Sequence, residues 1–267
     1  MTDQEFDRLM ERAASPNLIP GIYNYCDRRC ERCRFSERCL SNLESRQAQA
    51  SDPGDPHESV ATATGRTIGR AFDLVRIIAE RQGLDLSKTP EEDASDDREH
   101  DERDRRAMAD PIVALSRQYA MTAWPITRAL WPIVMPRGDA GVIEALETIE
   151  CLSTSISAKL YRAVSGTLES DFDASELQSD PNGSAKMARL LIAETRAAWR
   201  VLMEVGRATA NGVPARLVNM LDHLDSAVAV RFPRAMEFVR PGFDTEPAGS
   251  NEGDHDPALA VVPQGHA

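Results

Sequence analysis

Apolar residues recur at helical spacing along most of the chain, and no stretch of useful length alternates apolar and polar residues. Residues 2–14 carry their apolar side chains on one face, which predicts a short amphipathic helix. From Val60 the pattern is helical again, and Gly83 is a typical residue to end that helix. The pattern therefore predicts an all-α fold.

Four longer helices are predicted in the second half of the chain, beginning at Asp110, at Asp139, near residue 185 and near residue 214. Asp110 and Asp139 are typical N-cap residues, and proline follows Asp110 at the first helical position. Pro125 and Pro132 interrupt the first of these helices, and we expect them to kink or end it. Short connections favour antiparallel neighbours, so we predict an antiparallel helical bundle.

The chain divides by composition into four predicted parts. They are an N-terminal helix with a cysteine-rich segment over 1–46, a linker over 47–59, the helical bundle over 60–240, and a tail over 241–267. The linker is rich in small and polar residues and prolines, and the tail is acidic, Gly/Pro-rich and free of Lys and Arg. We therefore predict a disordered acidic C-terminal tail.

Charge and hydropathy exclude several functional classes. The formal net charge of -12 over 267 residues is unlike that of a general nucleic-acid binder, which needs a basic face. No run of eighteen apolar residues is present to cross a membrane, and the acidic N-terminus is not a secretory signal. We expect a cytoplasmic protein that binds neither nucleic acid nor membrane, and whose partner, if it has one, is another protein.

Four of the five cysteines lie within fourteen residues, as Cys26, Cys30, Cys33 and Cys39, in the spacing C-x3-C-x2-C-x5-C. We call residues 20–39 the cysteine clasp. Read as a helix, the clasp places its first three cysteines on one face, with Cys39 returning from a turn. Four thiolates around one point suit a zinc ion or a cubane iron–sulfur cluster. These four cysteines are the predicted metal or cluster ligands.

The clasp also carries an excess of positive charge. Five arginines share it with three acids; the arginines are Arg28, Arg29, Arg32, Arg34 and Arg38. Nearby cations lower the pKa of a thiol and stabilise thiolate sites. Four thiolates around Zn²⁺ or an oxidised [4Fe-4S] core leave a net charge of about minus two, which these arginines are suited to offset.

The four cysteines could form disulfides, remain inert thiols, bind zinc or bind an iron–sulfur cluster. Disulfides need an oxidising compartment, and inert thiols rarely cluster so tightly. Structural zinc sites usually pair two C-x2-C knuckles, whereas the clasp has only the one from Cys30 to Cys33. The spacing therefore favours a [4Fe-4S] cluster, with zinc as the alternative.

Two known iron–sulfur motifs share part of this spacing. Cys30-x-x-Cys33-x-Phe35-x-x-x-Cys39 resembles the iron–sulfur clasp of RecB-like nucleases, but the nuclease carboxylates and their sheet have no counterpart in this sequence. Cys26-x3-Cys30-x2-Cys33 also spells the motif of radical-SAM enzymes. Against that reading, Cys39 would occupy the open iron, and the alternating strands and helices of their barrel are missing.

A wider resemblance covers most of the chain. The sequence around the clasp at 19–26, the segments 180–186 and 197–199, and the segment 232–244 resemble a family of uncharacterised bacterial proteins with an N-terminal clasp and a helical C-terminal domain. The resemblance implies no activity. Where that family has tryptophan before the second cysteine this chain has Arg29, so we expect looser packing there.

Little in the sequence points to an enzyme. The Glu-x-x-His pairs of di-metal bundles are missing, and His223 lies off the apolar stripe of its helix. Glu194 falls within the apolar stripe of the helix near 185–209, so we predict a buried structural ion pair, with Arg231 or else Lys159 as its partner. Two hypotheses follow: a redox or sensory cluster-binding module, or a protein with structural zinc whose bundle binds a partner protein.

Overall fold

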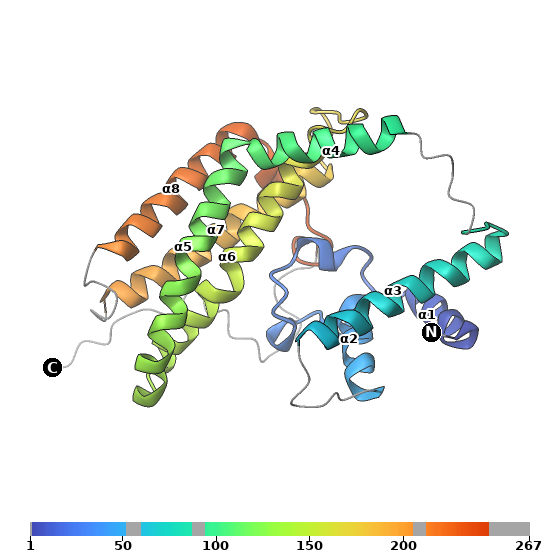
Figure 1. Ribbon diagram of the computed structural model, residues 1–267. Coiled ribbons are helices and arrows are strands. Elements are labelled where there is room, and N and C mark those ends of the chain that lie inside the picture. The colour runs from blue at the N-terminus through green and yellow to red at the C-terminus, as the bar shows by residue number, and fades with distance from the viewer. Residues whose placement is uncertain (1, 52–59, 87–93, 205–211, 246–267) are drawn as a thin grey trace.

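The computed structural model describes residues 2–51, 60–86, 94–204 and 212–245, and every regular element among them is helical (Figure 1). The α-helices are α1 (Asp3–Ala13), α2 (Leu40–Ser51), α3 (Val60–Gln82), α4 (Ala94–Ala109), α5 (Pro111–Val134), α6 (Ala140–Gly166), α7 (Asp180–Glu204) and α8 (Val213–Arg231). The short 3₁₀ turns are η1 (Ile22–Tyr25), η2 (Cys30–Arg32), η3 (Ser36–Arg38), η4 (Met135–Arg137) and η5 (Ala235–Glu237). The predicted all-α fold is confirmed.

Helices α5, α6, α7 and α8 form an antiparallel bundle in which each helix packs against two of the others (Figure 1). Its core holds large apolar side chains with no solvent exposure, including Leu146, Leu152 and Leu221. Trp199 and Tyr119 are buried with them, and the indole Nε1 of Trp199 donates a 2.8 Å hydrogen bond to the Tyr119 hydroxyl. The polar atoms of both rings are therefore satisfied inside an otherwise apolar core.

Local signals place the bundle helices correctly. The Asp110 carboxylate accepts from the Ile112 backbone N–H at 2.8 Å, and the Asp139 carboxylate accepts from the Val142 N–H at 3.2 Å. Both predicted N-caps are thus present and satisfy donors that a helix start leaves open. The two prolines inside α5 do not end it, because the helix continues to Val134.

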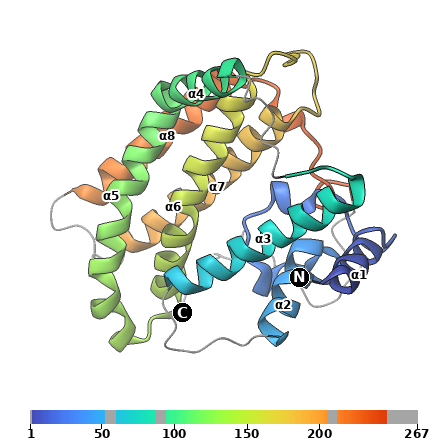
Figure 2. The same cartoon turned by 45° about the vertical axis from the view of Figure 1, so that its right-hand side comes forward.

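The N-terminal helices pack with one another beside the bundle. Helix α3 contacts α1 (Figure 2). Arg81 Nη1 lies 2.6 Å from the Asp7 carboxylate, and the Arg81 guanidinium lies over the Phe6 ring. We predicted α3 within the bundle, but its main packing is with α1. Helix α2 also runs to residue 51, past the predicted start of the linker, and residues 52–59 lie outside the described part of the chain.

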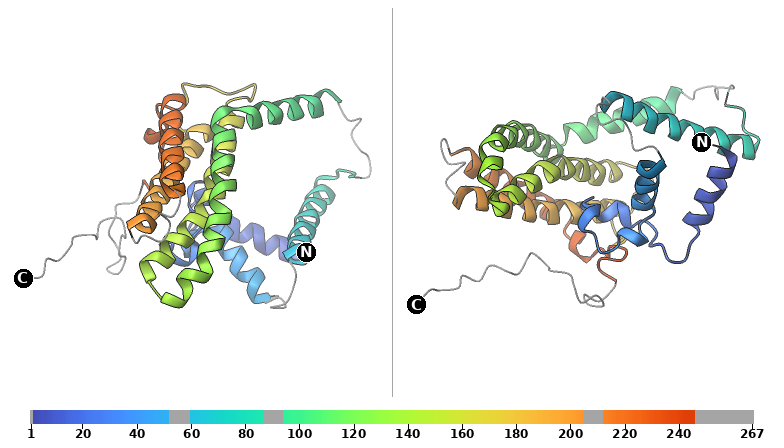
Figure 3. Two further views of the ribbon diagram at one scale, coloured as in Figure 1. Left: turned by 60° about the vertical axis from the view of Figure 1, so that its left-hand side comes forward. Right: turned by 90° about the horizontal axis from the view of Figure 1, so that it is seen from below.

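The charge-rich stretch before the bundle forms helix α4 from residue 94 onward, with most of its charged side chains exposed and Ala107 buried against the bundle core. Residues 241–245 of the predicted disordered tail are instead packed near the clasp, and the rest of that tail, 246–267, is not described. We call residues 238–245 the C-terminal hook, which Figure 3 (right) shows next to the clasp. Over the described residues, none of the helices is both long and apolar enough to cross a membrane.

Candidate functional site

The cysteine clasp is built from 3₁₀ turns and not from the single helix that we predicted. Cys26 ends η1 in an extended conformation, Cys30 begins η2, Cys33 follows η2, and Cys39 follows η3. The helix is broken at Arg28, which has a left-handed backbone with φ of 63°. Residues other than glycine seldom adopt this conformation, so a regular helix cannot continue from Cys26 to Cys30.

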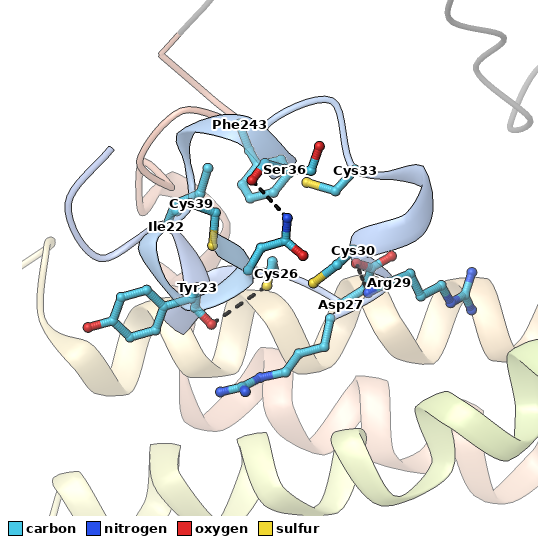
Figure 4. A pocket seen from close by; sticks show the side chains of 12 residues that line it. Ile22, Tyr23, Cys26, Asp27, Arg29, Cys30, Cys33, Ser36, Cys39 and Phe243 are labelled. Carbon is cyan, nitrogen blue, oxygen red and sulfur yellow. Dashed lines mark hydrogen bonds between the residues drawn. The ribbon is translucent and has the colours of Figure 1, made fainter. Parts of the chain in front are cut away.

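The four predicted ligands nevertheless line one pocket (Figure 4). Apolar side chains from the clasp and the hook, including Ile22 and Phe243, complete its wall. All five cysteines are free thiols, so the disulfide alternative is not realised. The fifth cysteine, Cys151, lies exposed on α6 and outside the pocket.

The thiols do not form a single-ion site in this arrangement. Among the described residues, no three His, Cys, Asp or Glu side chains are placed to hold one metal ion.

The electrostatics of the pocket differ from the sequence expectation. Burial raises the pKa of the Cys26, Cys30 and Cys33 thiols, and the neighbouring Cys26 and Cys39 raise that of Cys30 further. We expected the arginines to lower these pKa values, and Arg28 does lower that of Cys26. Partial burial outweighs this effect, so the net shift of the pKa is upward.

The arginines of the clasp are mostly directed at other partners. Arg32 Nη1 lies 3.0 Å from the Glu144 carboxylate on α6, and the Arg34 guanidinium lies over the Phe35 ring. Arg28 and Arg29 are the arginines that line the cysteine pocket. Fewer arginines are therefore close to the cysteines than the composition of the clasp indicates.

Arg29 is the buried cation of the site. Its side chain is 7% exposed, and its Nη1 lies 2.5 Å from Oε1 of Glu194 on α7, whose side chain is 43% exposed. Its other terminal nitrogen, Nη2, is buried and has no hydrogen-bond partner among the described residues. Burial of Arg29 also corrects our expectation of looser packing at this position.

The predicted environment of Glu194 is wrong in two respects. The carboxylate is not largely buried, and its partner is Arg29 and neither Arg231 nor Lys159. Lys159 donates instead to the Asn24 carbonyl in η1, and Arg231 contacts the Thr167 hydroxyl at 3.5 Å. Four residues of the predicted stripe of α7 are buried, namely Met187, Leu191, Ala198 and Leu202. The buried face is wider than predicted on the side away from Glu194, where it includes Ala188, Ile192, Thr195 and Trp199.

The C-terminal hook closes one side of the clasp. The Phe243 ring meets the Phe35 ring edge-on, with centroids 5.2 Å apart, and both belong to the small apolar cluster around Cys39. Gly242 has a left-handed backbone with φ of 77°, and an added Cβ would lie 3.0 Å from Ile19. A glycine is therefore needed where the hook turns against the clasp.

A buried lysine holds the hook in place. Lys186 on α7 is only 8% exposed, and its ammonium donates to the Asp244 carboxylate at 2.7 Å and to the Phe238 carbonyl at 2.6 Å. Arg240 Nη2 also donates to the Asp244 carboxylate, at 2.8 Å. Sequence reasoning missed this role, although Lys186 and Asp244 both fall in segments that carry the family resemblance.

A second set of contacts fixes η1 to the bundle. The Tyr25 ring packs against Phe238, with centroids 4.7 Å apart, and its hydroxyl donates to the Asp180 carboxylate at 2.8 Å. Arg162 on α6 donates to the same carboxylate at 2.5 and 2.6 Å. The segment that leads into Cys26 is therefore anchored on α6, α7 and the hook together.

Comparison with known proteins supplies no assignment. The chain matches no family model, no curated protein and no solved structure. A function has to be inferred from the cysteine pocket and its surroundings.

Proposed function

We propose that this protein binds a [4Fe-4S] cluster through Cys26, Cys30, Cys33 and Cys39, and that it works as a redox or sensory module. The observation that carries the proposal is the convergence of all four thiols on one pocket whose wall includes a buried arginine. Thiolates are the usual protein ligands of such clusters. When bound, a cluster of this kind accepts and donates single electrons.

The charge of the pocket supports an anionic occupant. An oxidised [4Fe-4S] core with four thiolates carries about two negative charges. Burial raises the pKa of the Cys26 thiol, whereas Arg28, which lines the pocket, and Lys159 both lower it. Cations close to a thiol stabilise its thiolate form.

The spacing of the cysteines in the sequence supports a cluster over a single zinc ion. Structural zinc sites usually pair two C-x2-C knuckles across a longer insert. The clasp has a single C-x2-C knuckle, Cys30 to Cys33, which favours the cluster.

The surrounding residues supply a route for signalling. Phe243 lines the pocket and packs edge-on against Phe35, and Arg29 extends from the pocket wall towards the bundle (Figure 4). Arg29 pairs with Glu194 on α7, so a change of charge in the pocket alters the balance of that ion pair. A sensory role requires such a link between the site and the bundle.

The test is to purify the protein without oxygen and to measure iron, acid-labile sulfide and zinc per chain. We expect about four iron and four sulfide per chain, with a broad absorbance that bleaches on reduction. The Cys151→Ser variant is the matched control, because this exposed cysteine lies outside the pocket and its loss should leave the iron content unchanged. Zinc alone under anaerobic handling would contradict the proposal and support the structural-zinc alternative.

A further inference from the structure

A second cavity, of about 320 Å³, lies between the loop after α6, the first turn of α7 and the end of α8. It is lined by Thr167, Phe172, Ala174, Asn182, Arg231, Phe232, Pro233 and Arg234. None of these residues lines the cysteine pocket. The volume falls in the range of about 300–1,000 Å³ that is typical of small-molecule sites.

Arg231, in the lining of this cavity, has guanidinium N–H groups that are not used in hydrogen bonds among the described residues. Within the described part of the chain Arg231 donates one hydrogen bond, to the Thr167 hydroxyl, at the long distance of 3.5 Å, and it has no acidic partner. By contrast, Arg189 on α7 has the Asp225 carboxylate at 2.8 Å. A guanidinium that lines a cavity with unused N–H groups is suited to bind a carboxylate through two parallel hydrogen bonds.

The second arginine adds charge that is only partly balanced. Arg234 contacts the Ser175 carbonyl and the Glu237 carboxylate, each at 3.4 Å. The adjoining loop carries Glu169, Asp171, Asp173 and Glu176, and none of these acids lines the cavity. Asp173 accepts hydrogen bonds from the Ser175 backbone and hydroxyl at 2.7 Å, so its carboxylate is engaged within that loop. The charged residues of the lining are therefore the two arginines, of which Arg234 contacts Glu237.

The remaining wall is largely apolar. Phe172, Phe232 and Pro233 contribute ring surface, and Asn182 contributes an amide whose nitrogen is bound to the Glu176 and Leu177 carbonyls. A bare inorganic anion would leave that ring surface in contact with water. We propose that the cavity binds a small organic monoanion, an aromatic carboxylate, with its carboxylate on Arg231 and its ring against Phe172 and Phe232.

The test uses benzoate as the probe in isothermal titration calorimetry with the full-length protein. Benzoate is expected to bind with a Kd of about 1 mM or tighter, which corresponds to about 4 kcal/mol. Benzamide has the same ring without the charge, and is expected to bind at least tenfold more weakly. Inorganic phosphate has the charge without the ring, and a comparable loss is expected.

Variants locate the site. Arg231→Gln should weaken benzoate binding at least tenfold, and Arg234→Gln should weaken it less, because Arg234 already has an acidic partner. Arg216→Gln is the matched control, since Arg216 is an exposed arginine of the same helix outside the lining. Circular dichroism confirms that each variant is folded. The proposal is overturned if benzoate does not bind at about 20 mM, if phosphate binds as tightly, or if Arg231→Gln and Arg216→Gln bind alike.

Discussion

Arg29 Nη1 lies 2.5 Å from Glu194 Oε1, and this ion pair joins the cysteine clasp to the middle of α7. The two partners differ in exposure, since the Arg29 side chain is 7% exposed and the Glu194 side chain is 43% exposed. Removal of the Glu194 carboxylate leaves the buried Arg29 cation without its ion-pair partner. Removal of Arg29 leaves a Glu194 carboxylate that water can solvate. The two halves of the pair are therefore unequal in their effect on stability.

Glu194→Ala should lower the free energy of unfolding by about 1–3 kcal/mol, because Arg29 then keeps a buried charge without its acid. Arg29→Met should cost less, since methionine fills similar space and removes the charge together with its unpaired Nη2. The double variant should resemble Arg29→Met. Chemical denaturation of the native protein, the two single variants and the double variant measures the free energy of unfolding of each. The comparison requires that the m-value, the slope of this free energy with denaturant, is the same in all four proteins.

The matched control for that series is Glu144→Ala. It breaks the pair between Arg32 and Glu144, which links the clasp to α6 at 3.0 Å but has side chains 42% and 56% exposed. Water screens such a pair, so a loss of about 0–1 kcal/mol is expected. Equal losses from Glu144→Ala and Glu194→Ala would contradict the role given to the burial of Arg29.

Cys33→Ser should remove the bound metal or cluster and loosen residues 20–45, while the bundle stays folded. The clasp has a small apolar cluster of its own, so metal–thiolate bonds are expected to supply much of its folding free energy. Iron and sulfide analysis reports the loss of ligand, and hydrogen exchange reports the loosening. Cys151→Ser should change neither, and a collapse of far-UV helicity in Cys33→Ser would contradict the separation of clasp and bundle.

The bundle was predictable because its signals are local. Asp110 and Asp139 are N-cap residues that mark where α5 and α6 begin, and apolar residues recur at helical spacing within each helix. The face of α7 was predicted only in part: Leu191 and Leu202 are buried as expected but Glu194 is not, because an ideal wheel weighs apolar character alone. The structure buries small residues such as Ala188 and Thr195, where close packing decides the face and hydrophobicity does not.

The candidate site was predictable only in part, for a similar reason. The spacing of the cysteines identified the four thiols of the pocket, but nothing local places Phe243 beside them or Lys186 against Asp244 of the hook. Those contacts span the length of the chain and depend on how the hook returns to α7. The left-handed backbone at Arg28 also carries no signal, since arginine seldom adopts it.

Asp244 should make the hook sensitive to acid. Burial raises the pKa of this carboxyl, but hydrogen bonds from Arg240 and Lys186 outweigh burial and hold the pKa well below its ordinary value of 3.8. A carboxyl with a lowered pKa stabilises the fold above its unfolded pKa, and that stabilisation is lost as the pH falls below about 4. The hook should therefore loosen in acid before the bundle core does.

The Asp244→Asn variant tests this linkage. At pH 7 it should unfold more easily than the native protein, because Lys186 loses its acidic partner. As the pH falls below about 4, the native carboxyl becomes protonated on unfolding and the difference between the two proteins should shrink. Denaturation midpoints compared between pH 7 and pH 3 give the result, and a difference that does not change with pH would contradict the assignment.

Gly183→Ala should disturb the cysteine site from a distance. An added Cβ at this position of α7 would collide with the Tyr25 ring and lie 2.7 Å from Cζ of Phe238, so the two rings that anchor η1 and the hook would have to move. Crowding of this kind costs about 1–3 kcal/mol and offsets the helix propensity gained from alanine. Gly141→Ala is the matched helical control, because its Cβ would meet only Asp139, at 3.8 Å, and should be neutral or stabilising by up to about 1 kcal/mol. Thermal denaturation compares the two variants, and hydrogen exchange over residues 20–45 locates the damage. If Gly183→Ala stabilised the protein as Gly141→Ala does, the packing of Tyr25 and Phe238 on α7 would not be what holds the clasp.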